Sequence, residues 1–200
     1  MRLKKSIKYG SLWVVVGLLL LNLATAADEK GTVEEFLKSN LDAVFTVLQK
    51  KDLSPQAKNS EIVEIVTPMC DFQLMAKLSL GRQYWPDLSK ENRERFTELF
   101  VNRLRESYLN KLTTYTDETV VYEQPVKVNG KVQIPTSLIS KGNKINMLYK
   151  FYQSSGQWKI YDIEIQGVSI IRSYQSQFNE ILRNSTFDDL LLKMEKPTTD

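Results

Sequence analysis

The segment 158–178 constrains the fold most, because a strand pattern, a glycine and a helical pattern follow one another along it. Tryptophan, tyrosine and isoleucine favour a strand directly after the Ser-Ser-Gly turn at 154–156. Trp158 and Ile160 have one parity in this strand, whereas the isoleucines that follow have the other. Two interpretations stay open: both faces of the strand are covered, or a β-bulge near Ile160 changes the phase.

A helix is expected to follow this strand. Gly167 permits a sharp turn at the end of the strand. Beyond it the apolar residues recur at spacings of three and four, which is the pattern of an amphipathic helix. These residues are Val168, Ile171, Tyr174, Phe178, Ile181 and Leu182. A strand covered by its own following helix forms a local α+β core.

The first 26 residues have the pattern of a secretory signal peptide. Basic residues precede an apolar run from Ser11 to Leu23, and Ala24-Thr25-Ala26 is an A-x-A cleavage site. An uncleaved membrane anchor is the alternative, but the run is shorter than the roughly 20 residues that span a bilayer. We therefore predict a signal peptide over 1–26 and a single domain over 27–200.

Charge and composition exclude several function classes. The chain has 27 Lys and Arg against 24 Asp and Glu, and the first 26 residues hold four of the basic and none of the acidic ones, which leaves 23 against 24. The net charge is therefore close to zero, whereas a nucleic-acid-binding protein typically has an excess of basic residues. The chain has no histidine, so the Ser-His-Asp triad and the Cys-His pair are excluded and a zinc site is disfavoured. We predict no metal and no cofactor.

Cys70 is the only cysteine, so an internal disulfide is excluded. The apolar residues around it in sequence favour a buried, inert thiol. Pairing with another chain is the alternative.

The chain up to Thr113 is predicted to be helical. Its helices are expected to begin at a capping box over 32–35, at Ser54-Pro55, at Asp71 and at Ser89, and Pro68 and Gly81 are expected to end the second and the third. Trp85, in the loop before the last of these helices, either plugs an edge of the core or lines the mouth of a pocket. The charged residues of that last helix are expected to face solvent: Arg93, Glu94, Arg95, Arg103, Arg105 and Glu106.

Four antiparallel strands are expected next, over 118–127, over 131–140, around 145–152 and from Trp158. Asn129-Gly130 is a strong hairpin signal, and 141–143 is a second turn. Pro135 has no backbone N–H to donate to a neighbouring strand, which predicts that this position lies on an edge strand or at a bulge. Helices over 169–184 and 186–193 complete the chain, with aspartates favourably placed in the first turn of the last one.

Two groups of these residues resemble the MlaC family, the toluene-tolerance, phospholipid-binding proteins of the bacterial periplasm. The run 161–169 followed by 174–178 is similar to the C-terminal signature of that family, and its motif residues here are Tyr161, Asp162, Gly167, Val168 and Ser169. The run 80–85 followed by Phe96, Phe100, Leu104 and Tyr108 is similar to the family's central helices. The resemblance covers most of the chain after Thr32.

The resemblance implies an α+β fold with a deep apolar pocket for phospholipid acyl chains. It further implies a soluble periplasmic carrier that shuttles lipid between an outer-membrane lipoprotein complex and an inner-membrane ABC transporter with an MCE-domain subunit, which maintains the lipid asymmetry of the outer membrane.

A pocket between sheet and helices also fits the pattern of the strands, which are apolar on nearly both parities. The pattern of apolar residues alone is equally consistent with a core that side chains fill. The resemblance to the MlaC family favours the pocket. We expect a four-stranded antiparallel sheet that packs with N-terminal and C-terminal helices around it. The predicted lipid-binding residues are Phe96, Phe100, Leu104, Met147, Tyr149, Phe151, Ile171, Tyr174 and Phe178.

An enzyme and a chaperone are the rival classes. Asp162 and Glu164 are the best remaining catalytic pair, because they share a strand face and one could act as an acid in a dry pocket. The alternatives are that both face solvent, or that Asp162 bonds a neighbouring backbone group. We predict a protein that is not an enzyme, and a periplasmic chaperone or a hydrophobic-ligand enzyme on a cone-shaped α+β fold remains the other possibility.

Overall fold

The computed structural model describes residues 24–109, 119–140 and 142–197. The helices are α1 (Ala24–Gln49), α2 (Pro55–Val66), η1 (Thr67–Met69), α3 (Phe72–Leu80), η2 (Trp85–Asp87), α4 (Lys90–Leu104), the π-helical η3 (Arg105–Leu109), α6 (Ile170–Leu182) and α7 (Phe187–Glu195). The strands are β1 (Thr119–Tyr122), β2 (Val126–Val128), β3 (Lys131–Ser140), β4 (Asn143–Ser154), β5 (Gln157–Ile165) and β6 (Val168–Ser169). Most of the predicted signal segment, the predicted helix end at Thr113 and Lys141 lie outside the described residues.

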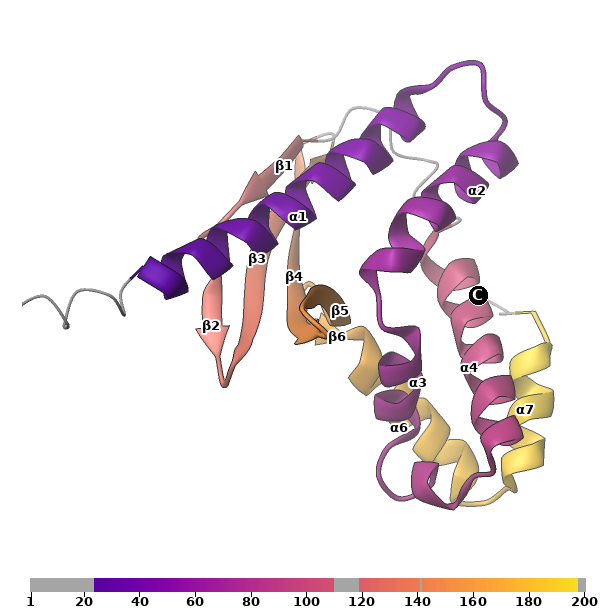
Figure 1. Ribbon diagram of the computed structural model, residues 1–200. Helices are drawn as coiled ribbons and strands as arrows, with labels where there is room; N and C mark the ends of the chain where they lie inside the picture. Colours follow the sequence, from indigo (N-terminus) through magenta and orange to yellow (C-terminus); the bar gives the residue numbers. More distant parts are fainter. Residues whose placement is uncertain (1–23, 110–118, 141, 198–200) are drawn as a thin grey trace, which may run out of the picture.

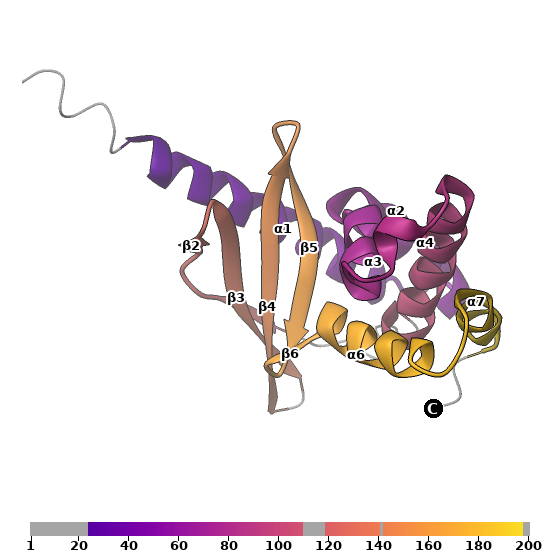
Figure 2. The ribbon, with the colours of Figure 1, turned by 90° about the horizontal axis from the view of Figure 1, so that it is seen from below.

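The sheet and a group of helices lie side by side (Figure 1). Helix α1 crosses one face of the sheet, and α3, α4, α6 and α7 gather beyond β5, as Figure 2 also shows. Helix α6 follows β6 directly and therefore connects the sheet to the helical group. In the described part of the chain, no helix combines the length and the apolar character that a membrane crossing requires.

The sheet is antiparallel, and its order is β1-β3-β4-β5-β6, with β2 also paired to β3. This arrangement confirms the predicted α+β class, but the predicted number of four strands is wrong. The expected strand over 118–127 is divided into β1 and β2, because Pro125 between them has no N–H for the ladder. Pro135 lies on β3 between the stretches that pair with β1 and with β2, so its missing N–H falls where the outer ladder is interrupted.

A β-bulge resolves the mixed parity of β5. Lys150 of β4 pairs with Asp162, whereas the next residue, Phe151, pairs with Ile160. Tyr161 is therefore the extra residue, and the isoleucines on either side of it face the same way. The bulge interpretation is confirmed.

The turn at Gly167 is tighter than expected. Gln166 and Gly167 have φ angles of 51° and 78°, and they connect Ile165 and Val168 in a two-residue hairpin. Val168 is 60% exposed in β6, so its predicted place on the buried helical stripe is wrong. The helical stripe begins only after Ser169, whose hydroxyl accepts from the backbone N–H of Arg172.

Most of the predicted helix starts are confirmed. At each of them a side-chain oxygen accepts a backbone N–H from the first turn, and the capping residues are Ser54, Asp71, Ser89, Ser169 and Thr186. The predicted start at 32–35 is wrong, because α1 already begins at Ala24. Alanine, glutamate and lysine at 26–30 are good helix formers, which explains why the helix extends beyond the capping signal.

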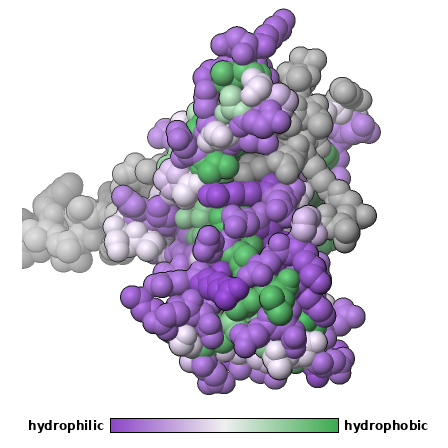
Figure 3. Space-filling model, turned by 90° about the vertical axis from the view of Figure 1, so that its right-hand side faces the viewer, coloured by the Kyte–Doolittle hydropathy of each residue, from purple (hydrophilic) through white to green (hydrophobic). Residues whose placement is uncertain are grey.

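Two apolar clusters form most of the core. The helical cluster joins α3, α4, α6 and α7 through Met75, Ala76, Leu80, Trp85, Phe96, Phe100, Leu104, Ile170, Ile171, Tyr174, Phe178, Leu190, Leu191 and Met194. The sheet cluster joins α1 to the inner face of the sheet through Val33, Leu37, Met69, Val132, Ile134, Tyr149, Phe151 and Ile160. Cys70 and Ile163 are partly buried against both clusters. Figure 3 shows that the outside of the helical end is mainly hydrophilic.

Candidate functional site

The predicted pocket residues are divided between the two clusters. Phe96, Phe100 and Leu104 of α4 meet Ile171, Tyr174 and Phe178 of α6 in the helical cluster. Tyr149 and Phe151 belong to the sheet cluster, and Met147 is partly buried against it. The structure thus brings the residues of α4 and α6 together, and it places the three residues of β4 on the neighbouring wall. Ile163 of β5 contacts both clusters and marks where these walls meet.

Aromatic rings fill the helical wall. Phe100 and Tyr174 pack edge to face with their ring centroids 5.3 Å apart, and Phe96 and Phe178 do so at 5.4 Å. Both phenylalanines of α4 are fully buried. The hydroxyl of Tyr174 lies 3.3 Å from Ser107 Oγ, so its polar end has a partner. This wall is closely packed by its own side chains.

Trp85 plugs the edge of this helical wall. It is 6% exposed and packs edge to face on Phe96 at a centroid distance of 6.3 Å. Arg93 lies 5.7 Å from the centroid of the indole ring and donates to the carbonyl oxygens of Trp85 and Pro86. The prediction that Trp85 plugs the core is therefore confirmed over the pocket-mouth alternative.

The arginines of α4 make internal contacts that the sequence did not predict. Arg103 donates to the carbonyl oxygens at the end of α7, at 3.3 Å for Met194 and 3.0 Å for Lys196. Arg95 forms an ion pair with Glu195 of the same helix end. The predicted solvated role is wrong for Arg103, because it satisfies the C-terminal end of a helix that lies far away in sequence. The side chain of Arg95 is 55% exposed, as predicted.

The sheet wall is covered by α1. Val33 and Leu37 are fully buried, and the Phe36 ring meets the fully buried Phe151 edge to face at 6.4 Å. Beside Phe151, Tyr149 is also buried, and its hydroxyl approaches Met147 Sδ at 3.6 Å. This wall therefore combines apolar packing with a buried phenol.

A buried ionic group joins β5 to the start of α6. Asp162 Oδ2 lies 2.9 Å from Lys150 Nζ and accepts from Ser169 Oγ at 2.8 Å, and its Oδ1 accepts from Ile171 N at 3.3 Å. Glu164 Oε1 lies 2.5 Å from the same ammonium. Burial lowers the pKa of Lys150, but hydrogen bonds and charges from Glu164 and Asp162 outweigh it and raise the pKa above its usual value.

These contacts assign a structural role to the motif residues. Asp162 and Glu164 do lie on one strand face, as predicted, but both are occupied by the ammonium of Lys150. Asp162 also accepts a backbone N–H of α6, which agrees with the bonding alternative rather than with catalysis. With Ser169 as the helix cap and Gly167 in the turn, the motif fixes how α6 leaves the sheet.

Cys70 lies between the clusters and forms a parallel β-bridge with Ile160. The residue as a whole is half-buried, while desolvation of its thiol raises the pKa to about 12. Such a thiol stays protonated at neutral pH and is a poor nucleophile. Over the described ranges, His, Cys, Asp and Glu do not gather in a group that could hold a metal ion.

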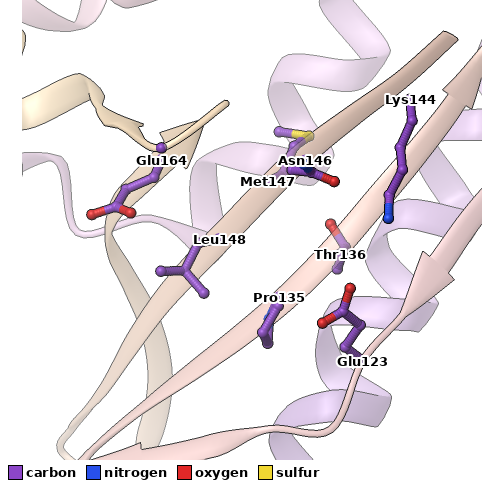
Figure 4. A pocket seen from close by; sticks show the side chains of 9 residues that line it. Glu123, Pro135, Thr136, Lys144, Asn146, Met147, Leu148 and Glu164 are labelled. Carbon is purple, nitrogen blue, oxygen red and sulfur yellow. The ribbon is translucent and has the colours of Figure 1, made fainter.

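A cleft of about 320 Å³ opens on the outer face of the sheet (Figure 4). Pro135 and Leu148 line it together with Glu123, Lys144 and Glu164. Met147, which packs against the sheet cluster, also borders this cleft. The sequence did not predict this cleft, because its residues come from separate strands.

Comparison with known proteins places the chain in a family. A family model described as MlaC protein matches residues 38–196. The chain belongs to the MlaC family. The resemblance predicted from the C-terminal motif and the central helices is thereby confirmed.

Similar MlaC-family proteins are named for lipid transport and toluene tolerance. The intermembrane phospholipid transport system binding protein MlaC of Haemophilus influenzae is 27% identical over 135 residues, which cover 64% of this chain and 63% of that protein. The toluene tolerance protein ttg2D of Pseudomonas putida is 22% identical over 138 residues, which cover 68% and 64%. The chain thus spans less than two thirds of both relatives.

A solved structure shares the MlaC fold described here. It is a phospholipid-binding protein from Ralstonia solanacearum in complex with a phospholipid, with a TM-score of 0.74 and 22% identity. The match covers 80% of this chain and 93% of that one. This chain therefore shares its arrangement of an antiparallel sheet beside a helical group with that protein.

Proposed function

We propose that this MlaC-family protein binds phospholipid and carries it across the periplasm. The observation that carries the proposal is the match of fold, at a TM-score of 0.74, to a protein that holds a phospholipid. The family match over residues 38–196 supports the same conclusion, since it includes both walls described above except the first part of α1.

The two apolar walls offer the apolar cover that the acyl chains of a phospholipid need. Burying one CH₂ group is worth about 0.8 kcal/mol, so two acyl chains with about 30 carbons need roughly 24 kcal/mol of apolar cover in transit. We propose that the chains lie where the α4 and α6 residues meet Met147, Tyr149 and Phe151 of β4. The pocket then consists of the nine residues predicted from the sequence, and phospholipid is its ligand.

The same proposal explains why catalytic groups are not needed. A carrier requires no nucleophile, metal or cofactor, and Asp162 and Glu164 serve to hold Lys150. We propose that residues 1–26 direct export and that the domain over 27–200 works in the periplasm. Its partners would be an outer-membrane lipoprotein complex and an inner-membrane ABC transporter with an MCE-domain subunit, which supplies the energy to maintain outer-membrane asymmetry.

Lipid analysis of the exported protein tests this function. The full chain is expressed with its leader, and the protein is purified from the periplasmic fraction without detergent and extracted with organic solvent. We expect an N-terminus at Ala27 and about one phospholipid molecule per protein by mass spectrometry. Extracted apolar peptide in place of lipid would favour a chaperone, and turnover of an added lipid to a new product would favour an enzyme.

A further inference from the structure

Two tyrosine hydroxyl groups of the sheet cluster lack a good acceptor. Tyr149 is 7% exposed, and its hydroxyl approaches only a thioether, Met147 Sδ, at 3.6 Å within the described residues. Thioether sulfur is a weak acceptor. The hydroxyl of Tyr122 is buried and has no hydrogen-bond partner in the part of the chain that the structure describes. Buried polar groups are nearly always paired in folded proteins, so both hydroxyls point to an acceptor that the chain itself does not supply.

Both phenols face the same side of the sheet. Tyr122 pairs with Thr136, which pairs in turn with Met147. Tyr149 lies two residues beyond Met147 on β4 and therefore on the same face. Both tyrosines pack in the sheet cluster that α1 covers, and the electrostatic effect of Tyr122 reaches Tyr149. The two hydroxyls thus serve one region of the interior.

Both phenols are donors at neutral pH. Desolvation, followed by the charge of Asp42, raises the pKa of Tyr122 to about 12. Desolvation also raises the pKa of Tyr149 well above its usual value, with smaller effects from Tyr122 and Cys70. Each group therefore keeps its proton and can donate one hydrogen bond to an oxygen of a ligand.

We propose that the hydroxyls of Tyr149 and Tyr122 donate hydrogen bonds to the ester carbonyl oxygens of the bound phospholipid. The inference rests on the proposed function, and it adds the residues that recognise the glycerol end of the cargo. Ester carbonyls accept hydrogen bonds and carry no charge, which suits a buried apolar wall. A phosphate group would bring a charge that must be desolvated, and the carboxylate of Asp42 beside Tyr122 would oppose it.

A pair of matched lipids tests the assignment. Lipid-free protein is titrated with dioleoyl phosphatidylcholine and with its diether analogue, which has the same headgroup and chain length but no carbonyl groups. We expect the wild type to bind the diester about fivefold more tightly, as one or two net hydrogen bonds imply. Tyr149→Phe and Tyr122→Phe should each remove part of the preference for the diester, and the double variant should bind the diester no more tightly than the diether. The diether affinity should stay unchanged in all three variants.

Melting temperatures and a control variant show whether Tyr149→Phe changes lipid binding only by altering the fold. Tyr149→Phe removes a hydroxyl whose acceptor is only the weak thioether of Met147, so the melting temperature without lipid should stay the same or rise. Tyr152→Phe is the control, because its hydroxyl donates to Asp71 instead. This control should lower the melting temperature and preserve the preference for the diester.

The possible failures are distinguishable. Equal binding of both lipids by the wild type would overturn the ester assignment and leave the carrier function intact. If Tyr149→Phe weakens both lipids equally, the hydroxyl contacts another part of the lipid, such as the phosphate, and the assignment is again overturned. If neither lipid binds to the wild type, the proposed function itself fails.

Discussion

The helical cluster and the sheet cluster differ in how completely they satisfy their own side chains. In the helical cluster the rings of Phe100 and Tyr174 pack against each other, and the tyrosine hydroxyl has Ser107 as a partner. In the sheet cluster Tyr149 has only a thioether nearby and Tyr122 has no partner among the described residues. The difference indicates that the helical cluster is a closely packed scaffold that forms one wall of the proposed pocket, whereas the sheet cluster has hydroxyl donors without a good acceptor among the described residues.

Both polar and apolar contacts join the two clusters. Asp162, Lys150 and Ser169 hold β5 to the start of α6, while Cys70 and Ile163 contact both clusters. Variants in the scaffold, at this boundary and in the sheet wall should therefore separate stability from lipid binding.

The largest effect is expected in the scaffold. Phe100→Ala removes a fully buried ring that contacts Phe96, Tyr174 and Phe178, and it should lower the free energy of unfolding by about 3–5 kcal/mol. Urea denaturation followed by circular dichroism measures the loss. Leu192→Ala on α7, where the side chain is 55% exposed, is the control and should change stability by less than about 0.5 kcal/mol. Similar midpoints for both variants would contradict a tightly packed scaffold.

A smaller loss is expected at the ionic boundary. Asp162→Asn leaves Lys150 with Glu164 as its remaining carboxylate partner among the described residues, and it weakens the anchor on the first turn of α6. We expect a loss of about 2 kcal/mol in the free energy of unfolding, less than for a fully broken buried pair. The exposed Glu123→Gln is the control with the same chemical change. Equal stability of the two variants would show that Asp162 does not anchor the helix.

The turn at the boundary should contribute less. Gly167 has a φ of 78°, and a Cβ there would meet no atom within 4 Å, so the cost of a side chain is one of backbone conformation alone. Gly167→Val should destabilise the fold by more than about 1 kcal/mol, whereas Gly167→Asn should cost clearly less, because asparagine tolerates positive φ. Thermal melts of both variants measure the difference, and an equal cost would remove the conformational argument.

The smallest effect is expected at Cys70, which touches both clusters. Cys70→Ser should cost about 1 kcal/mol or less and leave lipid transfer to acceptor vesicles unchanged, because the raised pKa makes the thiol inert. Loss of transfer in a variant that melts like the wild type would assign a function to the thiol.

Much of the fold was predictable because it depends on local signals. Ser54, Asp71, Ser89 and Thr186 each precede a helical pattern, and side chains at helix starts satisfy backbone donors within the same turn. Asn129-Gly130 likewise sets the β2–β3 hairpin through its positive φ angles.

The rest depends on contacts between residues that are distant in sequence. Arg103 was expected in solvent, yet it donates to the end of α7, which no pattern within α4 could indicate. The sequence did not predict that the hydroxyl of Tyr122 lacks a hydrogen-bond partner among the described residues, because its burial depends on the register with β3 and on the neighbouring α1. For the same reason the apolar residues of α4, α6 and β4 could be named from their spacing, while their division between the two clusters could not.

One pair of variants tests the central claim, that lipid lies against the inner face of the sheet. Met147 and Leu148 are neighbours on β4, both are half-buried and both line the outer cleft, but Met147 also packs against the sheet cluster. Each is changed to aspartate, and folded protein from the periplasm is assayed for bound phospholipid by mass spectrometry. The account predicts that Met147→Asp loses the lipid, because a carboxylate in an apolar wall lacks a partner, and that Leu148→Asp keeps it. Folded Met147→Asp protein that holds lipid at the wild-type level would contradict the claim.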